Sequence, residues 1–179
     1  MRSKLIAIIF VLLYSFLNQK TIAQTYPFSN LSTENGLSQS QILSVFQDED
    51  GVMWFGTNGA GIIKHDGKSF EYITDKDGLP DNFVFCITKN RLGKILVGTS
   101  NGLAIYDAKA KKGKRFKNYT TKNGLGNNLI FSIVFDRYGS ALLGTSKGVS
   151  KLTDTTCSAL KIDKKLDTSS VFHLLYDSK

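Results

Sequence analysis

One seven-residue pattern comes back twice along the chain and constrains its fold more than any other feature. Residues 51–57 read Gly-Val-Met-Trp-Phe-Gly-Thr, and residues 93–99 and 139–145 keep both glycines and the final threonine. The second glycine, at positions 56, 98 and 144, recurs after 42 and then 46 residues. Repeats of about 40–50 residues are typical of propeller blades, which are small antiparallel sheets of four strands. The spacing therefore predicts an all-β chain built of blades.

The segments around each copy recur as well. Each copy is preceded by a strand that is apolar on both faces, as expected of an inner strand between neighbouring blades. These inner strands are predicted at 42–46, 84–88 and 130–135, third strands at 62–65, 103–106 and 149–152, and aromatic fourth strands at 70–73 and 116–119. The sequence thus predicts a partial β-propeller of about three four-stranded antiparallel blades and the start of a fourth.

The turn before each copy combines an opening Asp or Asn with a closing glycine. Such a side chain bonds to backbone N–H groups, and glycine accepts positive φ without steric cost. The acidic run 48–50 could also suggest a calcium loop. The other copies have Arg91 and Arg137 within this turn, so the sequence predicts no metal site.

The repeat also sets the expected boundaries. An incomplete propeller is predicted over residues 24–179, with blades at about 36–76, 77–122 and 123–164, a partial blade at 165–179, and residues 26–31 as the outer strand of a preceding or closing blade. The chain stops one residue before the next expected turn glycine, which suggests a fragment or a truncated reading frame. Because propeller rings have about four to eight blades, we expect open faces that lead to self-association or poor solubility.

The first residues have the pattern of a secretory signal peptide. Arg2 and Lys4 precede an uncharged, mostly apolar run at 5–17, which is shorter than the roughly 20 residues that span a bilayer. We predict a signal peptide over 1–23 with cleavage after Ala23, and hence an exported protein. An uncleaved membrane anchor is the alternative.

Positive charge is concentrated in one segment. The whole chain has a formal net charge of +8, and six basic residues without an acid form a basic cluster, namely Lys109, Lys111, Lys112, Lys114, Arg115 and Lys117. This basic cluster could bind an anionic glycan, a lipid head group or nucleic acid. A solvated loop is the favoured interpretation, and an exported chain has little access to nucleic acid.

The two cysteines do not have the spacing of a metal site. An oxidising compartment would permit a bridge between Cys86 and Cys157. However, Cys86 occupies the repeat position that holds Ser44 and Ser132, a small-residue position in a buried strand. We therefore predict that Cys86 is a packed free thiol.

Taken together, these motifs resemble the two-component regulator propeller repeat. The resemblance rests on Asp48, Gly51, Trp54, Gly56, Thr57 and Gly61, and the later copies depart from it where Leu96 and Leu142 replace the tryptophan. It implies the N-terminal periplasmic sensor part of a Bacteroidota-type hybrid two-component receptor. In that family a membrane helix and a cytoplasmic histidine kinase usually follow, and oligosaccharides are the typical signals.

The resemblance suggests a non-enzymatic sensor segment for oligosaccharides, with no catalytic residue and no cofactor. A stand-alone interaction propeller and, less favoured, a secreted polysaccharide-active enzyme are the alternatives. No kinase motif is present in this sequence, and His65 and His173 are interpreted as structural. Expected partners are an oligosaccharide bound by the loops, further blades or a second copy. A membrane is expected only through downstream segments, and nucleic acid is not expected.

The residues singled out are therefore structural ones. They are the repeat positions Gly51, Trp54, Gly56, Thr57, Gly61, Gly93, Gly98, Thr99, Gly102, Gly139, Gly144, Thr145 and Gly148. Trp54 is expected to fill space between blades. Gly98 is expected to adopt a left-handed backbone conformation, with close packing between blades as the alternative. Ligand contacts are expected from the loops, which differ between copies.

Overall fold

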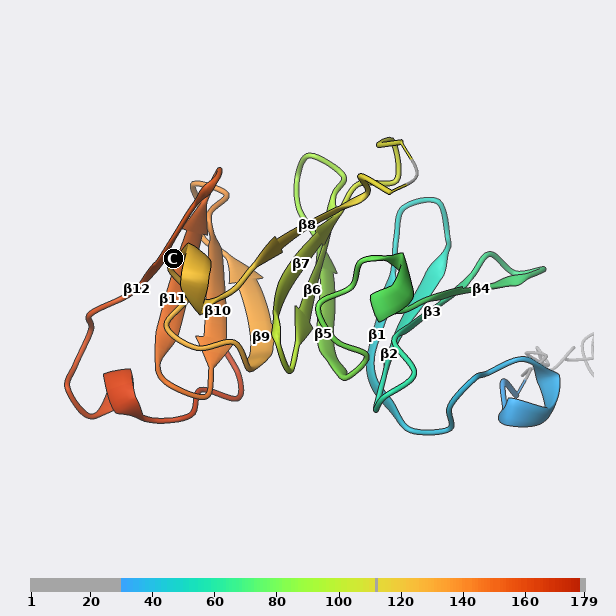
Figure 1. Cartoon of the computed structure of the whole chain (residues 1–179), viewed down its shortest axis with the longest axis horizontal. Helices are drawn as coiled ribbons and strands as arrows, with labels where there is room; N and C mark the ends of the chain where they lie inside the picture. Colours follow the sequence, from blue (N-terminus) through green and yellow to red (C-terminus); the bar gives the residue numbers. More distant parts are fainter. Residues whose placement is uncertain (1–29, 112, 178–179) are drawn as a thin grey trace, which may run out of the picture. The chain divides into compact units, whose positions relative to one another are not determined.

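The computed structural model describes residues 30–111 and 113–177, and it is all-β (Figure 1). Three antiparallel sheets of four strands each follow one another along the chain. Blade one contains β1 (Ile42–Gln47), β2 (Met53–Thr57), β3 (Ile62–His65) and β4 (Phe70–Ile73). Blade two contains β5 (Val84–Lys89), β6 (Ile95–Thr99), β7 (Gly102–Tyr106) and β8 (Phe116–Tyr119). Blade three contains β9 (Ile130–Phe135), β10 (Ala141–Thr145), β11 (Val149–Thr153) and β12 (Thr156–Ala159). The predicted fold class is confirmed.

Short 3-10 turns, which the repeat pattern did not reveal, precede the inner strands. They are η1 (Thr33–Asn35), η2 (Asp75–Asp77) and η3 (Thr121–Asn123), and a fourth, η4 (Leu166–Thr168), follows blade three. In η2 the backbone N–H of Thr74 donates to the Asp77 carboxylate at 2.9 Å. In η3 the backbone N–H of Thr120 donates to Asn123 in the same way, at 3.0 Å. These three-residue turns position the Gly-Leu pairs that begin each blade.

The hairpin turns have the chemistry predicted from the sequence. Asp48 Oδ1 accepts hydrogen bonds from the backbone N–H groups of Asp50 and Val52, at 3.1 and 2.9 Å. Gly51 has a φ of +80°, and its equivalents Gly93 and Gly139 have φ values of +77° and +85°. Glycine is the residue best suited to this left-handed region. The first glycine of each copy is therefore a turn residue.

The second glycine of each copy has a different role, and the left-handed expectation for Gly98 is wrong. Gly56, Gly98 and Gly144 are not among the glycines with positive φ. A β-carbon on Gly98 would lie 2.8 Å from Ile130 Cγ2 and 3.2 Å from the Ile130 carbonyl oxygen, both in the next blade. On Gly56 it would lie 2.7 Å from Val84 Cγ1. These glycines let the inner strand of one blade approach β2 or β6 of the preceding blade closely.

The threonine that ends each copy satisfies a buried turn. Thr57, Thr99 and Thr145 are fully buried. Their hydroxyl groups donate to the carbonyl oxygens of the third repeat glycine, Gly61, Gly102 and Gly148, at 2.8, 2.8 and 2.9 Å. Gly61, Gly102 and Gly148 have positive φ. The threonine and the third glycine are thus one structural unit that closes the hairpin between the second and third strands.

The apolar core lies mainly between neighbouring blades. One cluster joins residues such as Trp54 and Ile62 of blade one to Val84, Ile87 and Tyr106 of blade two. A second cluster joins blades two and three in the same way, from Leu96 and Leu103 to Ile130 and Leu143. The prediction that Trp54 fills space between blades is confirmed. Each blade therefore depends on its neighbour for burial.

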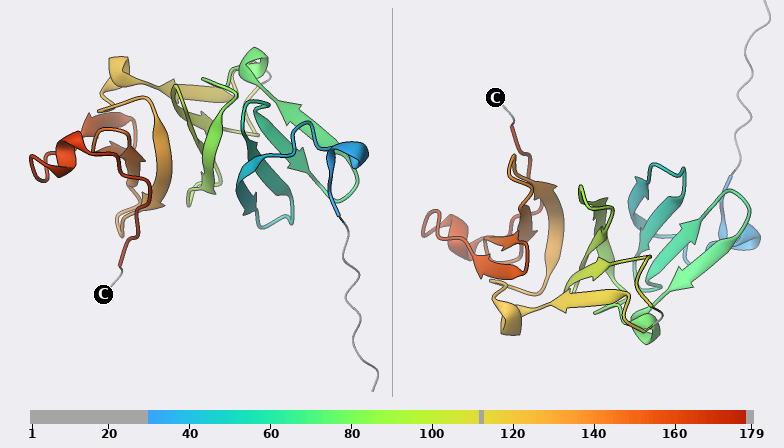
Figure 2. Two further views of the ribbon diagram at one scale, coloured as in Figure 1. Left: turned by 90° about the horizontal axis from the view of Figure 1, so that it is seen from below. Right: turned by 90° about the horizontal axis from the view of Figure 1, so that it is seen from above.

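Residues 170–177 begin to repeat the path of an inner strand but do not form one (Figure 2). Val171 lies against Gly144, as Val84 lies against Gly56 and Ile130 against Gly98. Its backbone N–H donates to the Thr145 carbonyl at 2.9 Å, and Phe172 packs on Phe131 with ring centroids 4.7 Å apart. The expected fourth blade thus has its first contacts, and the boundaries predicted for it stay predictions.

Several expectations lie outside the described residues. They are the signal peptide, nearly all of the outer strand at 26–31, and Lys112. Within the part of the chain that the structure covers, no helix has the length and apolar character needed to cross a membrane.

Candidate functional site

A cavity of about 430 Å³ lies between blades one and two, beside their outer strands. Blade one contributes Glu71 and Tyr72 of β4 together with Lys76 and Asp77 of η2. Blade two contributes Tyr106 at the end of β7 and Arg115 and Phe116 at the start of β8. Ligand pockets usually have volumes of about 300–1,000 Å³ and combine aromatic walls with a few polar groups. The cavity fits that description.

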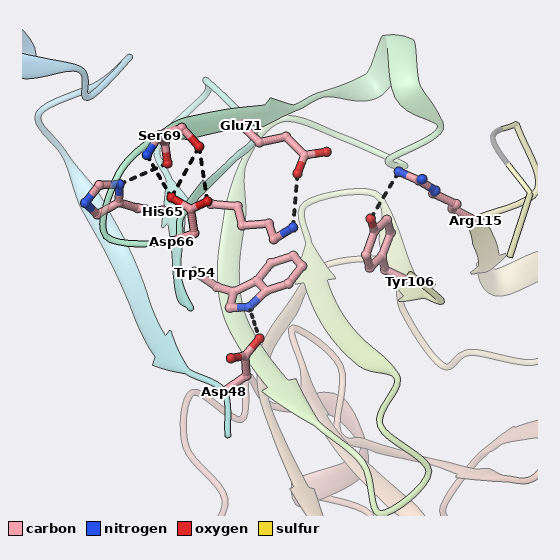
Figure 3. A network of polar contacts seen from close by, with 9 residues as sticks. Asp48, Trp54, His65, Asp66, Ser69, Glu71, Tyr106 and Arg115 are labelled. Atoms are coloured by element: carbon pink, nitrogen blue, oxygen red, sulfur yellow. Dashed lines mark hydrogen bonds and ion pairs between the residues drawn. The ribbon is translucent and has the colours of Figure 1, made fainter. Parts of the chain in front are cut away.

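The aromatic wall of the cavity is fixed from behind. Tyr106 is buried, and its ring meets Trp54 edge-on with centroids 5.7 Å apart. Phe116 lies opposite Tyr106 in the β7–β8 pairing, with ring centroids 5.1 Å apart. Trp54 is held in turn by its indole N–H, which donates to Asp48 at 3.0 Å (Figure 3). The repeat tryptophan thus supports a wall of the cavity without lining it.

Both acids of the cavity already have partners. Glu71 pairs with Lys64 at 3.1 Å, and Lys64 also lies 5.5 Å from the centre of the Trp54 ring. Asp77 accepts the Thr74 backbone N–H and the Thr74 hydroxyl, at 2.9 and 3.1 Å. These two carboxylates therefore have structural roles in the outer strand and in η2.

Arg115 lies on the cavity, and its side chain has few hydrogen-bond partners. Its backbone is anchored because its carbonyl accepts the Asp107 N–H at 2.8 Å, which closes the β7–β8 loop. One terminal nitrogen, Nη1, donates to the Tyr106 hydroxyl across a long 3.5 Å (Figure 3). Its Nε is buried without a hydrogen-bond partner. Within residues 30–111 and 113–177, no carboxylate forms an ion pair with this guanidinium.

The structure divides the basic cluster into two kinds of residue. Lys109, Lys111, Lys114 and Lys117 are exposed, as expected of a solvated loop. Arg115 is half-buried in the cavity. The sequence did not separate Arg115 from its neighbours. A usable signal was its repeat position, which holds Ser69 in blade one and Thr156 in blade three, both without charge.

His65, the first of the two histidines, is the last residue of β3 and borders the turn that leads to β4. Its Nδ1 lies 3.0 Å from the Ser69 carbonyl oxygen, and its ring stacks on Phe70 with centroids 4.3 Å apart. In the same turn, the backbone N–H groups of Ser69 and Lys68 donate to Asp66 and lower the pKa of its carboxyl to about 2. These contacts agree with the structural interpretation of His65. His173 is exposed on the segment after blade three.

Both cysteines are free thiols, as predicted for Cys86. Burial raises the pKa of Cys86 to about 12, and burial also raises the pKa of Cys157. Thiols with such values are poor nucleophiles near neutral pH. Among the described side chains, no group of three or more His, Cys, Asp and Glu residues is arranged to hold a metal ion.

Residues 36–59 match the family model described as the two component regulator propeller. This stretch of blade one is similar to a two-component regulator propeller repeat. This match begins at the Gly-Leu pair of blade one and continues past the Trp-Phe-Gly-Thr motif, so it covers the residues that carried the resemblance except Gly61. No curated protein sequence matches the chain.

The fold is similar to those of larger solved proteins. The extracellular domain of the hybrid two component system BT3049 from B. thetaiotaomicron matches with a TM-score of 0.71 and 21% identity, over 83% of this chain. The virginiamycin B lyase from Staphylococcus aureus matches with a TM-score of 0.52 and 17% identity, over 71% of this chain. The chain spans only 20% of the first protein and 44% of the second. Because both sequence identities are low, these matches establish the fold alone.

Proposed function

We propose that the chain is a non-enzymatic segment of a periplasmic sensor propeller in a two-component signalling receptor, and that it binds an oligosaccharide. The observation that carries the proposal is the regulator propeller repeat at 36–59 within blades whose fold resembles an extracellular receptor domain. The cavity between blades one and two supports a binding role, because its aromatic wall is rigid and both of its acids are engaged in structural bonds.

A panel of oligosaccharides tests this function. We expect at least one of them to raise the melting temperature of the exported, purified chain, because a ligand that binds only the folded state stabilises it by about 2.7 kcal/mol at 100 times its Kd. The same oligosaccharide should be recovered intact after prolonged incubation. New reducing ends would instead support the enzyme alternative, and no response to any oligosaccharide would contradict the proposal.

We further propose that, when the chain is alone, a second copy of it covers the face of blade one that lies away from blade two. Val45 of blade one and Ile87 of blade two occupy the same repeat position. Ile87 faces blade one and is 7% exposed, whereas Val45 is 56% exposed. The Ser44 hydroxyl accepts the backbone N–H of Ile87 in the next blade at 3.1 Å, whereas the equivalent Ser132 hydroxyl is buried without a partner. On the blade-three side, Val171 already lies beside Gly144 in the place of the next inner strand, so the face of blade one that lies away from blade two is the open half of this interface.

Light scattering of the purified chain tests this association. We expect a mass above that of one chain, and we expect Val45→Asp to shift the distribution toward the monomer because it places a charge on the proposed interface. Leu92 is 80% exposed on a turn, so Leu92→Asp is the matched control and should leave the distribution unchanged. A monomer across the concentration range would contradict self-association.

A further inference from the structure

The charge of Arg115 is poorly compensated for its position. A guanidinium has five N–H donors, but one long hydrogen bond to Tyr106 is the contact seen here, and the buried Nε has no partner. Buried polar groups in folded proteins are nearly always hydrogen-bonded, because an unsatisfied one destabilises the structure. Among the described residues, the Arg115 guanidinium therefore has N–H groups without a hydrogen-bond acceptor.

The surroundings of Arg115 define the chemistry of that acceptor. Lys76, also on the cavity, forms no ion pair among the described residues either. The charged residues that line the cavity are Lys76, Arg115, Glu71 and Asp77, and their formal charges sum to zero. Both carboxylates are engaged with blade-one partners, Lys64 and Thr74, so neither serves as the acceptor for Arg115. A carboxylate matches the planar fork of a guanidinium, to which it can bind through two parallel hydrogen bonds.

The rest of the cavity suits a sugar ring attached to that carboxylate. Tyr106 and Phe116 form an apolar wall, and Tyr72, 47% exposed, stands on the blade-one side. Tyr72 is oriented because its hydroxyl donates to the Gly36 carbonyl at 2.7 Å. The Lys76 ammonium and the Tyr106 hydroxyl can bond to ring hydroxyls. The volume of about 430 Å³ accommodates a sugar residue.

We propose that this cavity binds a carboxylate-bearing sugar residue of an oligosaccharide, with the Arg115 guanidinium as the carboxylate ligand. The inference rests on the proposed function and names its ligand class. Arg115 and Tyr106 depart from the other copies, which have Ser69 with His65 and Thr156 with Leu152 at these positions. Ligand specificity would then come from the β7–β8 loop, which differs from the equivalent loops of the other blades, whereas the strands that carry it are common to all three blades.

Titration calorimetry with a matched pair of ligands tests this site. The probes are a tetrasaccharide of galacturonic acid and the same tetrasaccharide with every carboxyl group methyl-esterified, which removes the charge. We expect the acid form to bind at least about tenfold more tightly, since a hydrogen bond between charged groups is lost in the ester. Arg115→Gln should remove this preference, and Arg115→Lys should restore part of it.

Lys111→Gln is the control variant. It removes the same charge from the same loop, but Lys111 is exposed and does not line the cavity. Its affinity for the acid tetrasaccharide should stay within about twofold, because exposed charges are screened by solvent and salt. The melting temperature of each variant shows whether Arg115 is needed for folding, and Arg115→Lys keeps the site testable if the glutamine variant unfolds.

The outcomes separate this site from the wider function. Equal binding of the acid and the ester, or an unchanged preference in Arg115→Gln, would overturn the carboxylate site while oligosaccharide binding stands. Binding of a tetraglutamate peptide with higher affinity than the acid tetrasaccharide would overturn the sugar as ligand. If no oligosaccharide of the earlier panel binds either, the proposed function itself fails.

Discussion

Replacing Gly98 by valine is expected to lower the free energy of unfolding by at least about 2 kcal/mol, which urea denaturation would measure. Its β-carbon would meet the Cys86 sulfur within the same blade and the Ile130 side chain and carbonyl of the next blade. A backbone carbonyl cannot move aside as a flexible side chain can. Interiors are close-packed, so the added atoms must separate β6 from β9 or distort both.

Two further variants distinguish packing from backbone strain. Gly93→Ala places a methyl group where the nearest atom is 3.8 Å away, but at a φ of +77°, so its cost of about 1–2 kcal/mol comes from the left-handed conformation. Gly98→Ala has no such strain, and its cost should fall when Cys86→Ala is added, because the sulfur is then absent. Additive costs in this double-mutant cycle would contradict the close-packing explanation, as would an unchanged urea midpoint in Gly98→Val.

The contrast between Gly93 and Gly98 shows what the repeat could reveal. Both glycines recur in all three copies, so the sequence identified both as structural. The Asp or Asn before the first glycine gives local evidence for a turn, and that prediction is confirmed at Gly51, Gly93 and Gly139. Nothing within three residues of Gly98 indicates that Ile130 lies against it. The contacts between blades at Gly56–Val84 and Gly98–Ile130 join residues 28 and 32 positions apart, and a repeat shows equivalent positions without showing which of them touch.

Arg115 was hidden from the sequence for the same reason. It lies within a run of lysines, and the formal charge of the segment is the same whether a side chain is solvated or half-buried. Its environment depends on Tyr106, nine residues earlier, and on Glu71 and Lys76 in another blade. The strands could be predicted because alternation and turn residues are local. The candidate site could not, because it forms where two blades meet.

Replacing Trp54 by alanine is expected to have a larger effect than Gly98→Val, with a loss of about 3–5 kcal/mol in the free energy of unfolding. The Trp54 side chain is 3% exposed and packs between Lys64 and the Tyr106 ring. Truncation leaves a cavity between blades one and two and removes the indole N–H that donates a hydrogen bond to Asp48. Thermal or urea unfolding measures the loss, and Tyr138→Ala is the control, because Tyr138 is 78% exposed and should change stability by less than about 0.5 kcal/mol.

Trp54→Leu separates two contributions of Trp54 to stability, namely packing in the common blade framework and support of the Tyr106 wall. Leucine is the residue that the repeat itself has at positions 96 and 142. If Trp54 serves the common blade framework, leucine should recover most of the stability lost in Trp54→Ala. If the tryptophan instead supports the Tyr106 wall, the leucine variant should stay well below the original stability, since leucine cannot reach Tyr106 with an aromatic edge or donate to Asp48. The 5.7 Å contact with Tyr106 and the 3.0 Å hydrogen bond to Asp48 favour the second outcome. A leucine variant as stable as the original chain would contradict it and return Trp54 to the role of simple filler.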